Sequence, residues 1–578
     1  MRPIATSFLL SLIAVTAVAQ QGWYQWGRNG AHDSASPVVG QSLGRIEAEI
    51  VVDPHAADAQ FATGGNLLIH YQVPLVDGAD IYSVLKGGTF TNPATRDTQT
   101  WNVQNLRRTP AGVAQRWLYQ SDWKPLPFGS GGPTWEPVYH LAVTDDAVWA
   151  PAAGGTLDKI SRADGTRLAR INPFGLSIDP TIFTAGPPSA DAQGNIYYTA
   201  IRVAPAAPWS NDPLASWLVR IDRNGTSSVR TFTALVPNAP AADATTCTSQ
   251  FPSGQLPWPP SPDAVAPTTR CGVQRPGVNI APAIAPDGTV YVISRAHVND
   301  RWGYLVAVNA DLTPKWAASL RNRFNDGCNV LLPPNGTPGG CRAGAATGVS
   351  PDDNQPGSGR VTDNSTSSPV VTPDGNILYG AYTRYNYSQG HLMMFDANGN
   401  YLRAYPFGWD LTPAIWRHDG TYSVLLKQNQ YGLGSYCGDG AHCPGDRTLN
   451  TPNDPEAYYI SQLNPQLQLE WKFRNTETRS CGRRDDGTIE CLDDHPNGFE
   501  WCVNAVAVDA AGIVYANAED GYLYSIDQGG LLRQRLFLRL ALGAAYTPLS
   551  IGPDGRIYTQ NDGYLFIVGS LPKRRSAR

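Results

Sequence analysis

The chain has 578 residues and a formal net charge of −5, and only 16% of its residues are charged. Hydrophobic residues make up 42% of the chain and aromatic residues 10%, which excludes a disordered protein, and no basic excess favours nucleic acid. Its 57 glycines and 47 prolines indicate a turn-rich fold without the collagen period, so collagen, a coiled coil and a multi-span membrane protein are also excluded.

The first predicted element is a secretory signal peptide over residues 1–19. Arg2 precedes a mainly apolar run that ends in Ala17–Ala19, where small residues occupy the −3 and −1 positions of a cleavage site. We expect cleavage before Gln20. A transmembrane helix is the alternative, but the run is short for one. The expected location is therefore secreted or periplasmic, and the lack of a cysteine at the cleavage point argues against a lipoprotein.

One sequence pattern then recurs along the whole chain. An alternating apolar stretch leads into an Asp-Gly-like turn, followed by a second stretch that contains Tyr or Trp. Eight copies begin at Pro74, His140, Pro188, Pro282, Pro369, Pro413, Ala505 and Pro548. Where nothing intervenes, successive turns lie about 43 to 47 residues apart, and a period in the low forties with several strands per repeat is typical of propeller blades.

A second strand–turn–strand unit follows most of these copies, as in GYLVAVNADLTPKW from Gly303 and GYLYSIDQGGLLRQ from Gly521. Gly and Asn in such turns favour tight hairpins because both tolerate positive φ. Each blade is therefore predicted to hold four antiparallel strands, A to D. The predicted fold class is all-β, a β-propeller of eight four-stranded blades, or of seven if residues 413–473 do not form a full blade.

These copies resemble the repeats of the PQQ-like β-propeller superfamily, which includes the quinoprotein dehydrogenases and the BamB-type outer-membrane assembly factors. The resemblance spans essentially the whole mature chain, so we expect one propeller domain over residues 20–572 and a basic tail over residues 573–578. The opening Trp23–His32 resembles the family's N-terminal strand. This implies that a strand near residues 23–29 closes the last blade, which otherwise ends at Tyr564–Gly569.

Strand alternation predicts that all long insertions lie on one face of the ring. The short A–B and C–D turns share one end of the blades, and the B–C and D–A connections share the other. We call this second end the insertion-rich face. Its insertions are residues 86–100, 203–216, 232–276, 322–366, 430–456 and 474–501. Loops on a rigid scaffold often carry binding, which we expect here, with simple capping of the central channel as the alternative.

Export would permit disulfides among the nine cysteines, all of which lie in or beside these insertions. No CxxC pair and no histidine cluster supports a zinc site. Closeness in sequence favours the pairs Cys247–Cys271, Cys328–Cys341 and Cys437–Cys443, and leaves one bond and one thiol among Cys481, Cys491 and Cys502.

Arginines follow the last predicted strand of two blades at similar positions, where the chain returns to the insertion-rich face. Arg321 and Arg323 follow one blade, and Arg474 and Arg479 follow another. Such side chains can bind an anion or a glycan hydroxyl in a bidentate manner, although pairing with a nearby carboxylate is the common alternative. Tryptophans of the loops could stack on sugar rings or pack in the core. They are Trp123, Trp135, Trp209, Trp258, Trp409 and Trp501.

Two features bear on a metal or cofactor. The acidic residues Asp485, Asp486, Asp493 and Asp494 could hold a cation, although Asp486 is also explained as part of a hairpin turn. The superfamily resemblance implies PQQ with Ca²⁺ as possible cofactors, held by carboxylate, Asn and Arg side chains. The adjacent Cys-Cys pair of the alcohol-oxidising members is absent, as are GxSxG, SxxK and HExxH motifs.

The sequence therefore favours an exported binding or scaffold protein that acts through its insertion-rich face, with no catalysis of its own established. The alternatives are a PQQ- and Ca²⁺-dependent dehydrogenase of alcohols or sugars, a BamB-like outer-membrane assembly scaffold and a glycan-binding propeller. We expect a monomer with an unknown ligand or protein partner, without nucleic acid and without a membrane span.

Overall fold

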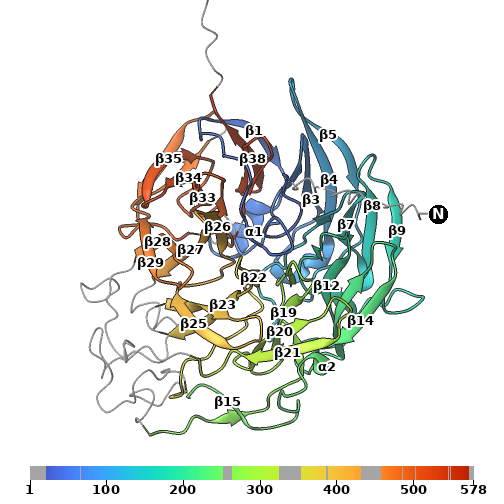
Figure 1. Cartoon of the computed structure of the whole chain (residues 1–578). Coiled ribbons are helices and arrows are strands. Elements are labelled where there is room, and N and C mark those ends of the chain that lie inside the picture. Colours follow the sequence, from blue (N-terminus) through green and yellow to red (C-terminus); the bar gives the residue numbers. More distant parts are fainter. Residues whose placement is uncertain are drawn as a thin grey trace, which may run out of the picture.

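The computed structural model describes residues 21–65, 67–251, 263–323, 353–385, 388–430, 457–484, 486–501, 503–543, 546 and 548–571. Eight antiparallel sheets surround a central axis, and they follow one another clockwise from blue to red in Figure 1. The prediction of an eight-bladed propeller is confirmed.

Blades 1 to 4 come from the first half of the chain. From the axis outward, blade 1 consists of β2 (Leu75–Asp77), β3 (Asp80–Gly88), β4 (Gln99–Thr109) and β5 (Gly112–Tyr119), and blade 2 of β6 (Ala142–Val143), β7 (Ala147–Pro151), β8 (Leu157–Ser161) and β9 (Arg167–Ile171). Blade 3 consists of β10 (Ile182–Thr184), β11 (Ser189–Ala190), β12 (Ile196–Arg202), β13 (Ala215–Ile221) and β14 (Ser227–Thr231), and blade 4 of β17 (Gln274–Pro276), β18 (Ala283–Ile284), β19 (Val290–Ala296), β20 (Gly303–Val308) and β21 (Pro314–Ser319).

Blades 5 to 8 complete the ring. Blade 5 consists of β22 (Val370–Val371), β23 (Ile377–Tyr385), β24 (Ser388–Phe395) and β25 (Tyr401–Pro406), and blade 6 of β26 (Ala414–His418), β27 (Thr421–Gln430), β28 (Ala457–Leu463) and β29 (Leu469–Arg474). Blade 7 consists of β32 (Ala507–Val508), β33 (Val514–Asn517), β34 (Tyr522–Asp527) and β35 (Leu531–Phe537), and blade 8 of β36 (Ser550–Ile551), β37 (Ile557–Asn561), β38 (Tyr564–Gly569) and β1 (Arg45–Val51).

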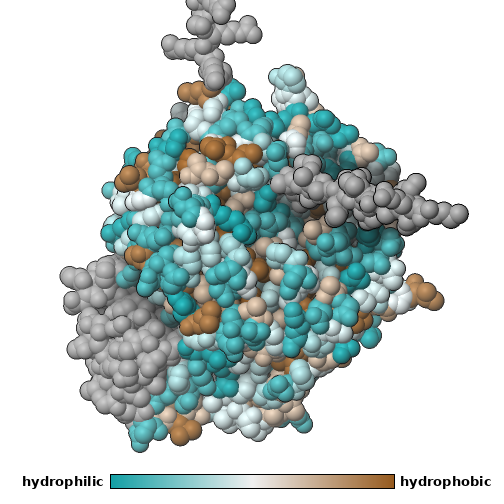
Figure 2. Space-filling model, in the orientation of Figure 1, coloured by the Kyte–Doolittle hydropathy of each residue, from teal (hydrophilic) through white to brown (hydrophobic). Residues whose placement is uncertain are grey.

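The remaining elements lie in the connections between strands. They are the hairpins β15–β16 (Cys247–Thr248 with Thr268–Thr269) and β30–β31 (Arg479–Arg483 with Ile489–Asp493), the helices α1 (Ala56–Ala62) and α2 (Phe232–Leu235), and the 3₁₀ turns η1 (Pro93–Thr98) and η2 (Ala153–Gly155). No helix in the described ranges is long and apolar enough to cross a membrane. Figure 2 shows a mainly hydrophilic surface on which the apolar groups form small, separate patches.

The ring is closed by β1, whose residues pair antiparallel with β38 from Arg45 opposite Gly569 to Val51 opposite Tyr564. The expectation that an N-terminal strand completes the last blade is confirmed, but its position near residues 23–29 was wrong. The physical reason is that the backbone groups of residues 23–36 bond elsewhere, to the inner strands.

Residues 23–41, called the N-terminal segment below, lie across the short-turn end of the ring. Trp23 and Val76 exchange two backbone hydrogen bonds of 2.8 Å each, and the Gln25 side chain bonds to the backbone of Ala190. Further backbone amides on inner strands donate to this segment. These bonds are Val143 N to Tyr24 O, Ile284 N to Gly30 O, Val371 N to Ala31 O, Ile415 N to Asp33 O and Val508 N to Ser34 O.

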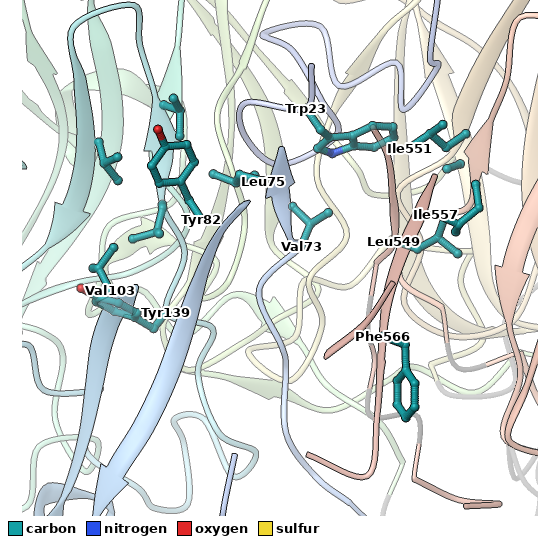
Figure 3. Close-up of a cluster of buried hydrophobic side chains, with 14 of the residues drawn as sticks. Trp23, Val73, Leu75, Tyr82, Val103, Tyr139, Leu549, Ile551, Ile557 and Phe566 are labelled. Atoms are coloured by element: carbon teal, nitrogen blue, oxygen red, sulfur yellow. The ribbon is translucent and has the colours of Figure 1, made fainter. Parts of the chain in front are cut away.

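Gln41 N completes the circuit with a bond to the carbonyl of Gly555 in blade 8. The N-terminal segment therefore contacts all eight blades in turn. Figure 3 shows Trp23 beside Ile551 at the junction of the last blade and the first, within a core cluster that spans both. The N-terminal segment therefore lies over the inner strands at the short-turn end of the ring.

Neighbouring blades are locked by outer-strand tryptophans that cover a glycine of the next blade. The Trp117 ring of blade 1 lies on Gly165 of blade 2, where a Cβ would come within 2.8 Å of the ring and φ is +76°. Trp316 covers Gly399 and Trp471 covers the turn at Gly530 in the same way. Glycine is needed at such a turn because it provides both the positive φ and the close approach.

Candidate functional site

The channel opens at the insertion-rich face through the residues that lead into the inner strands. Because each blade begins with a chain segment that descends from this face, the residues just before the inner strands surround the mouth of the channel. Figure 1 shows α1 near the centre of the ring in this view. We describe the mouth as a polar layer, an aromatic cluster and an adjoining side pocket.

The first part of the polar layer is centred on Asp410, which is 3% exposed. Its two carboxylate oxygens accept hydrogen bonds from Ser365 Oγ at 2.9 Å, from Thr366 N at 2.7 Å and Thr366 Oγ1 at 3.0 Å, and from Asn504 Nδ2 at 2.7 Å. A carboxylate offers about four acceptor positions, so neutral donors saturate Asp410.

The second part of the polar layer is centred on Asp363. Arg275 makes a bidentate ion pair with it, with N–O distances of 2.9 and 2.5 Å, and Arg295 adds a third contact at 3.3 Å. Burial would raise the pKa of Asp363, but the two guanidinium groups outweigh it and hold the pKa at about 2. The charge of Asp363 is therefore fully compensated inside the protein.

The third carboxylate near the mouth is Glu136. Its oxygens accept hydrogen bonds from Lys86 Nζ at 2.9 Å and from Trp101 Nε1 at 3.2 Å. Lys86 also donates to Asp53 at 2.8 Å, so this buried lysine bridges two carboxylates. The ion pair anchors the segment that carries Trp135 to blade 1.

Next to the polar layer lies an aromatic cluster formed by Trp135, Tyr382, Trp409 and Tyr546, of which Trp135 and Trp409 directly precede Glu136 and Asp410 in the sequence. The ring centroids are 4.7 Å apart for Trp135 and Tyr546, 6.1 Å for Trp135 and Trp409, and 4.9 Å for Tyr382 and Trp409. All four side chains are half-buried, so each presents part of its surface to solvent. They come from the segments leading into blades 2, 6 and 8 and from β23 of blade 5. The four rings therefore meet only when the ring of blades is closed.

His70 lies against this cluster with its ring centroid 5.5 Å from those of both Trp135 and Tyr546. Burial lowers the pKa of His70, so the neutral ring is favoured. Its Nδ1 is 3.0 Å from the carbonyl oxygen of Glu136 and 3.4 Å from Nδ2 of Asn279, and its Nε2 is a buried polar atom without a hydrogen-bond partner among the described residues. Trp409 Nε1 is likewise a buried donor without an acceptor.

A side pocket of about 280 Å³ adjoins the cluster through Trp135. It lies between α1, η1 and the segment before blade 2. The lining is mainly apolar, with Ala59, Leu68, Ile69, Phe90, Pro93, Phe128 and Trp135. Arg96, Thr63, Thr134 and Glu136 add the polar groups.

The donor set of the mouth does not fit PQQ with a hard cation. Ca²⁺ takes six to eight oxygen ligands, several of them carboxylates. Here Asp410 is saturated by neutral donors, Asp363 is neutralised by two arginines and Glu136 is bound to Lys86. Within the ranges described by the structure, no three His, Cys, Asp or Glu side chains come together as a metal site.

The predicted arginines lie at two separate blade exits, with blade 5 between them. The Arg321 guanidinium stacks 3.5 Å from the ring centroid of Trp302, and Arg323 Nε donates to the carbonyl of Ser319 at 2.7 Å. Arg479 pairs with Glu477 at 3.0 Å, and Arg474 is exposed at the end of β29. A ligand-binding role for them stays a prediction.

The predicted tryptophans divide into two groups. Trp501 is fully buried and packs against Phe473 and Tyr524, so its ring presents no surface to a sugar. Trp135 and Trp409 instead meet in the aromatic cluster. Trp258 lies outside the described residues.

The acidic candidates belong to the β30–β31 hairpin. Asp486 accepts from Thr488 within the turn, as the simpler explanation expected, and Asp494 accepts from Ser480 at 2.8 Å. Asp493 is exposed in β31, and Asp485 lies outside the described residues.

One expected cysteine pair, and the bond that the sequence left open, can be examined in the structure. The pair Cys247–Cys271 is confirmed as a disulfide, and Cys481 pairs with Cys491, which settles the bond that the sequence left open. The other cysteines lie outside the described residues. They are Cys328, Cys341, Cys437, Cys443 and Cys502.

Sequence reasoning missed His70, Arg96, Asp410 and Asn504. A usable signal was present, because several of these residues stand a few positions before an inner-strand copy. Asp410 precedes the copy at Pro413, as Trp135 precedes the copy at His140. Reading the positions upstream of each copy, rather than the insertions, would have located the mouth.

The sequence matches no family model and no curated protein. Among solved structures it is similar to the quinohemoprotein alcohol dehydrogenase from Comamonas testosteroni, at 12% identity over 97% of this chain and 83% of that chain, with a TM-score of 0.53. It is also similar to the quinohemoprotein alcohol dehydrogenase ADHIIG from Pseudomonas putida HK5, at 12% identity, with 95% and 76% covered and a TM-score of 0.51.

BamB from Moraxella catarrhalis matches at 11% identity over 90% of this chain and 98% of that chain, with a TM-score of only 0.38. At such identities the likeness to the two dehydrogenases concerns the fold and not the activity. By its repeats, its eight blades and this likeness, the chain has the fold of the PQQ-like β-propellers.

Proposed function

We propose that the protein is an exported binding protein that takes a ligand at the channel mouth on its insertion-rich face, without chemistry of its own. One observation carries the proposal: four half-buried aromatic rings from distant parts of the chain meet there, next to buried polar atoms without partners. Aromatic rings offer flat apolar faces, and the His70 Nε2 and Trp409 Nε1 atoms offer polar groups, as in typical ligand sites.

The N-terminal segment supports the same proposal. It bonds to the inner strands at the short-turn end of the ring, which leaves the insertion-rich face as the side from which we propose that a small molecule enters. A dehydrogenase is less well supported, because the carboxylates at the mouth are already compensated by protein groups.

The experiment compares two tryptophans of blade 6, one just before the inner strand β26 and one within it. Trp409 belongs to the mouth, whereas Trp416 is half-buried beside Gly512 at the short-turn end. Binding of 3-phenylpropan-1-ol, cellobiose and PQQ with and without Ca²⁺ is measured by isothermal titration calorimetry on the full mature chain and on Trp409→Ala and Trp416→Ala.

We expect the aromatic alcohol to bind the parent protein and Trp416→Ala equally, and to bind Trp409→Ala about three- to tenfold more weakly. Preferential binding of cellobiose would assign the site to glycans. Binding of PQQ that depends on Ca²⁺ would overturn the proposal in favour of the dehydrogenase. Absence of binding by every probe, or equal loss in both variants, would also overturn it.

A further inference from the structure

The side pocket contains a buried arginine that lacks an anionic partner. Arg96 is only 5% exposed and lines the pocket from η1. Its Nη2 donates to the carbonyl of Thr134 at 3.0 Å, and its guanidinium lies 5.2 Å from the ring centroid of Phe128. Its Nη1 is buried without any acceptor.

The nearest carboxylate does not fill this role. Glu136 lines the same pocket, but its oxygens are bonded to Lys86 and Trp101. No ion pair joins it to Arg96 among the described residues. Burial lowers the pKa of Arg96 to about 10, which reflects the cost of holding a guanidinium away from water with little compensation from Glu136.

The pocket around Arg96 has the composition of a site for an amphipathic molecule. Seven of its lining residues are apolar, and its polar lining consists of Arg96, Thr63, Thr134 and Glu136. Its volume is about 280 Å³, which is roughly nine times the volume that one water molecule occupies in liquid water. A ligand of about ten non-hydrogen atoms would fill such a volume. A guanidinium with free N–H donors is the usual partner of a carboxylate, which it binds in a bidentate manner.

We infer that the side pocket binds a small monocarboxylic acid with an apolar body, whose carboxylate pairs with Arg96 and whose body packs between Phe90, Phe128 and Trp135. This inference rests on the proposed function, because it names the chemistry of the ligand held at the same face. Trp135 belongs to both the pocket and the aromatic cluster, so an acid in the pocket touches the mouth.

The test compares two probes with the same body and different head groups. Binding of 3-phenylpropanoate and of 3-phenylpropan-1-ol is measured by isothermal titration calorimetry near neutral pH on the full mature chain. The variants are Arg96→Gln and, as a matched control, Arg202→Gln, which removes a half-exposed arginine that pairs with Asp179 on the same face. We expect the acid to bind the parent and Arg202→Gln at least tenfold more tightly than the alcohol, and this preference to vanish in Arg96→Gln.

A second variant guards against a folding defect in Arg96→Gln. Ala59 lines the pocket from α1, so the larger side chain of Ala59→Phe occupies the pocket while the Arg96 side chain itself is retained. We expect this variant to keep the thermal midpoint of the parent and to lose binding of the acid at least tenfold. Retention of tight acid binding in Ala59→Phe would refute the pocket as the site.

The remaining outcomes separate the inference from the proposed function. Equal binding of acid and alcohol by the parent would refute the inference and leave a ligand-binding mouth in place. Acid preference that persists in Arg96→Gln would refute the role of Arg96. Binding of neither probe would refute the inference, and would refute the proposed function as well if cellobiose and PQQ also fail to bind.

Discussion

The N-terminal segment contains a histidine whose titration should weaken the fold in acid. His32 is fully buried, and its Nδ1–H donates to the carbonyl of Pro369 at 2.8 Å. Burial lowers its pKa from 6.5 to about 4, although the carbonyl contact opposes the shift. The unfolded chain therefore takes up a proton near pH 6.5, while the folded chain stays neutral until about pH 4, so stability is lost as pH falls through this window.

The magnitude follows from the two pKa values. At pH 5 the unfolded state gains about 2 kcal/mol from protonating His32, whereas the folded state gains almost nothing. Burial also lowers the pKa of His140, to about 3, and His32 contributes to that shift. Because His140 remains in both proteins compared below, its own contribution largely cancels.

The perturbation is His32→Asn. His32 has φ of +60°, a conformation that Asn tolerates, and the Asn amide does not titrate. The free energy of unfolding is measured by urea denaturation, followed by tryptophan fluorescence, at about pH 7.5 and about pH 5. We expect the parent to lose about 2 kcal/mol more than the variant over this interval.

The control is Ser189→Ala, which removes the 3.4 Å contact of Ser189 Oγ with His32 Nε2 and keeps the imidazole. Its loss of stability between the two pH values should match that of the parent. If His32→Asn shows the same pH dependence as the parent, the buried neutral histidine is not the source of the acid sensitivity and the reasoning fails.

Three further predictions concern the ring. Asp363→Asn leaves two buried arginines without a counterion and should cost about 3–5 kcal/mol in urea unfolding; a loss below about 1 kcal/mol would contradict the buried ion pair. Gly165→Ala should lower the thermal midpoint more than Gly78→Ala, because both have positive φ but only the first meets the Trp117 ring; equal losses would exclude the clash. Burial raises the pKa of Asp520 to about 6, so protonation of Asp520 should stabilise the folded state by about 1 kcal/mol between pH 7 and pH 5, opposite in sign to the contribution of His32. Asp520→Asn should therefore lose about 1 kcal/mol more stability than the parent over this interval, and an unchanged pH profile would argue against it.

The blades were predictable because their turn chemistry repeats. The Asp-Gly turns near 287 and 374 fixed the register of inner strands, and the structure has β18–β19 and β22–β23 around them. The closing strand was not predictable from such signals. Its sequence, RIEAEIV, is not joined by a short turn to the strand with which it pairs. Its half-exposed burial pattern is that of any outer strand.

The mouth was only partly predictable for a different reason. The sequence shows Trp135 and Trp409 as tryptophans of loops. The contacts of Trp135 with Trp409 and with Tyr546 depend on the positions of blades 2, 6 and 8 around the closed ring. The position of Arg96 depends on η1 and α1 lining the same pocket, and the sequences of these two short elements contain no strong local signal. Long-range closure, rather than local propensity, decides both.

The order of synthesis gives the N-terminal segment a further consequence. Residues 23–51 leave the ribosome before β2 to β38, yet β1 pairs with β38, more than 500 residues later, and Gln41 bonds to Gly555. The earliest part of the chain can therefore adopt its final place only after the last blade has been made. Until then the growing protein is an open arc whose two end blades each lack a neighbour on one face, and a chain cut short before Tyr564 would lack the strand with which β1 pairs.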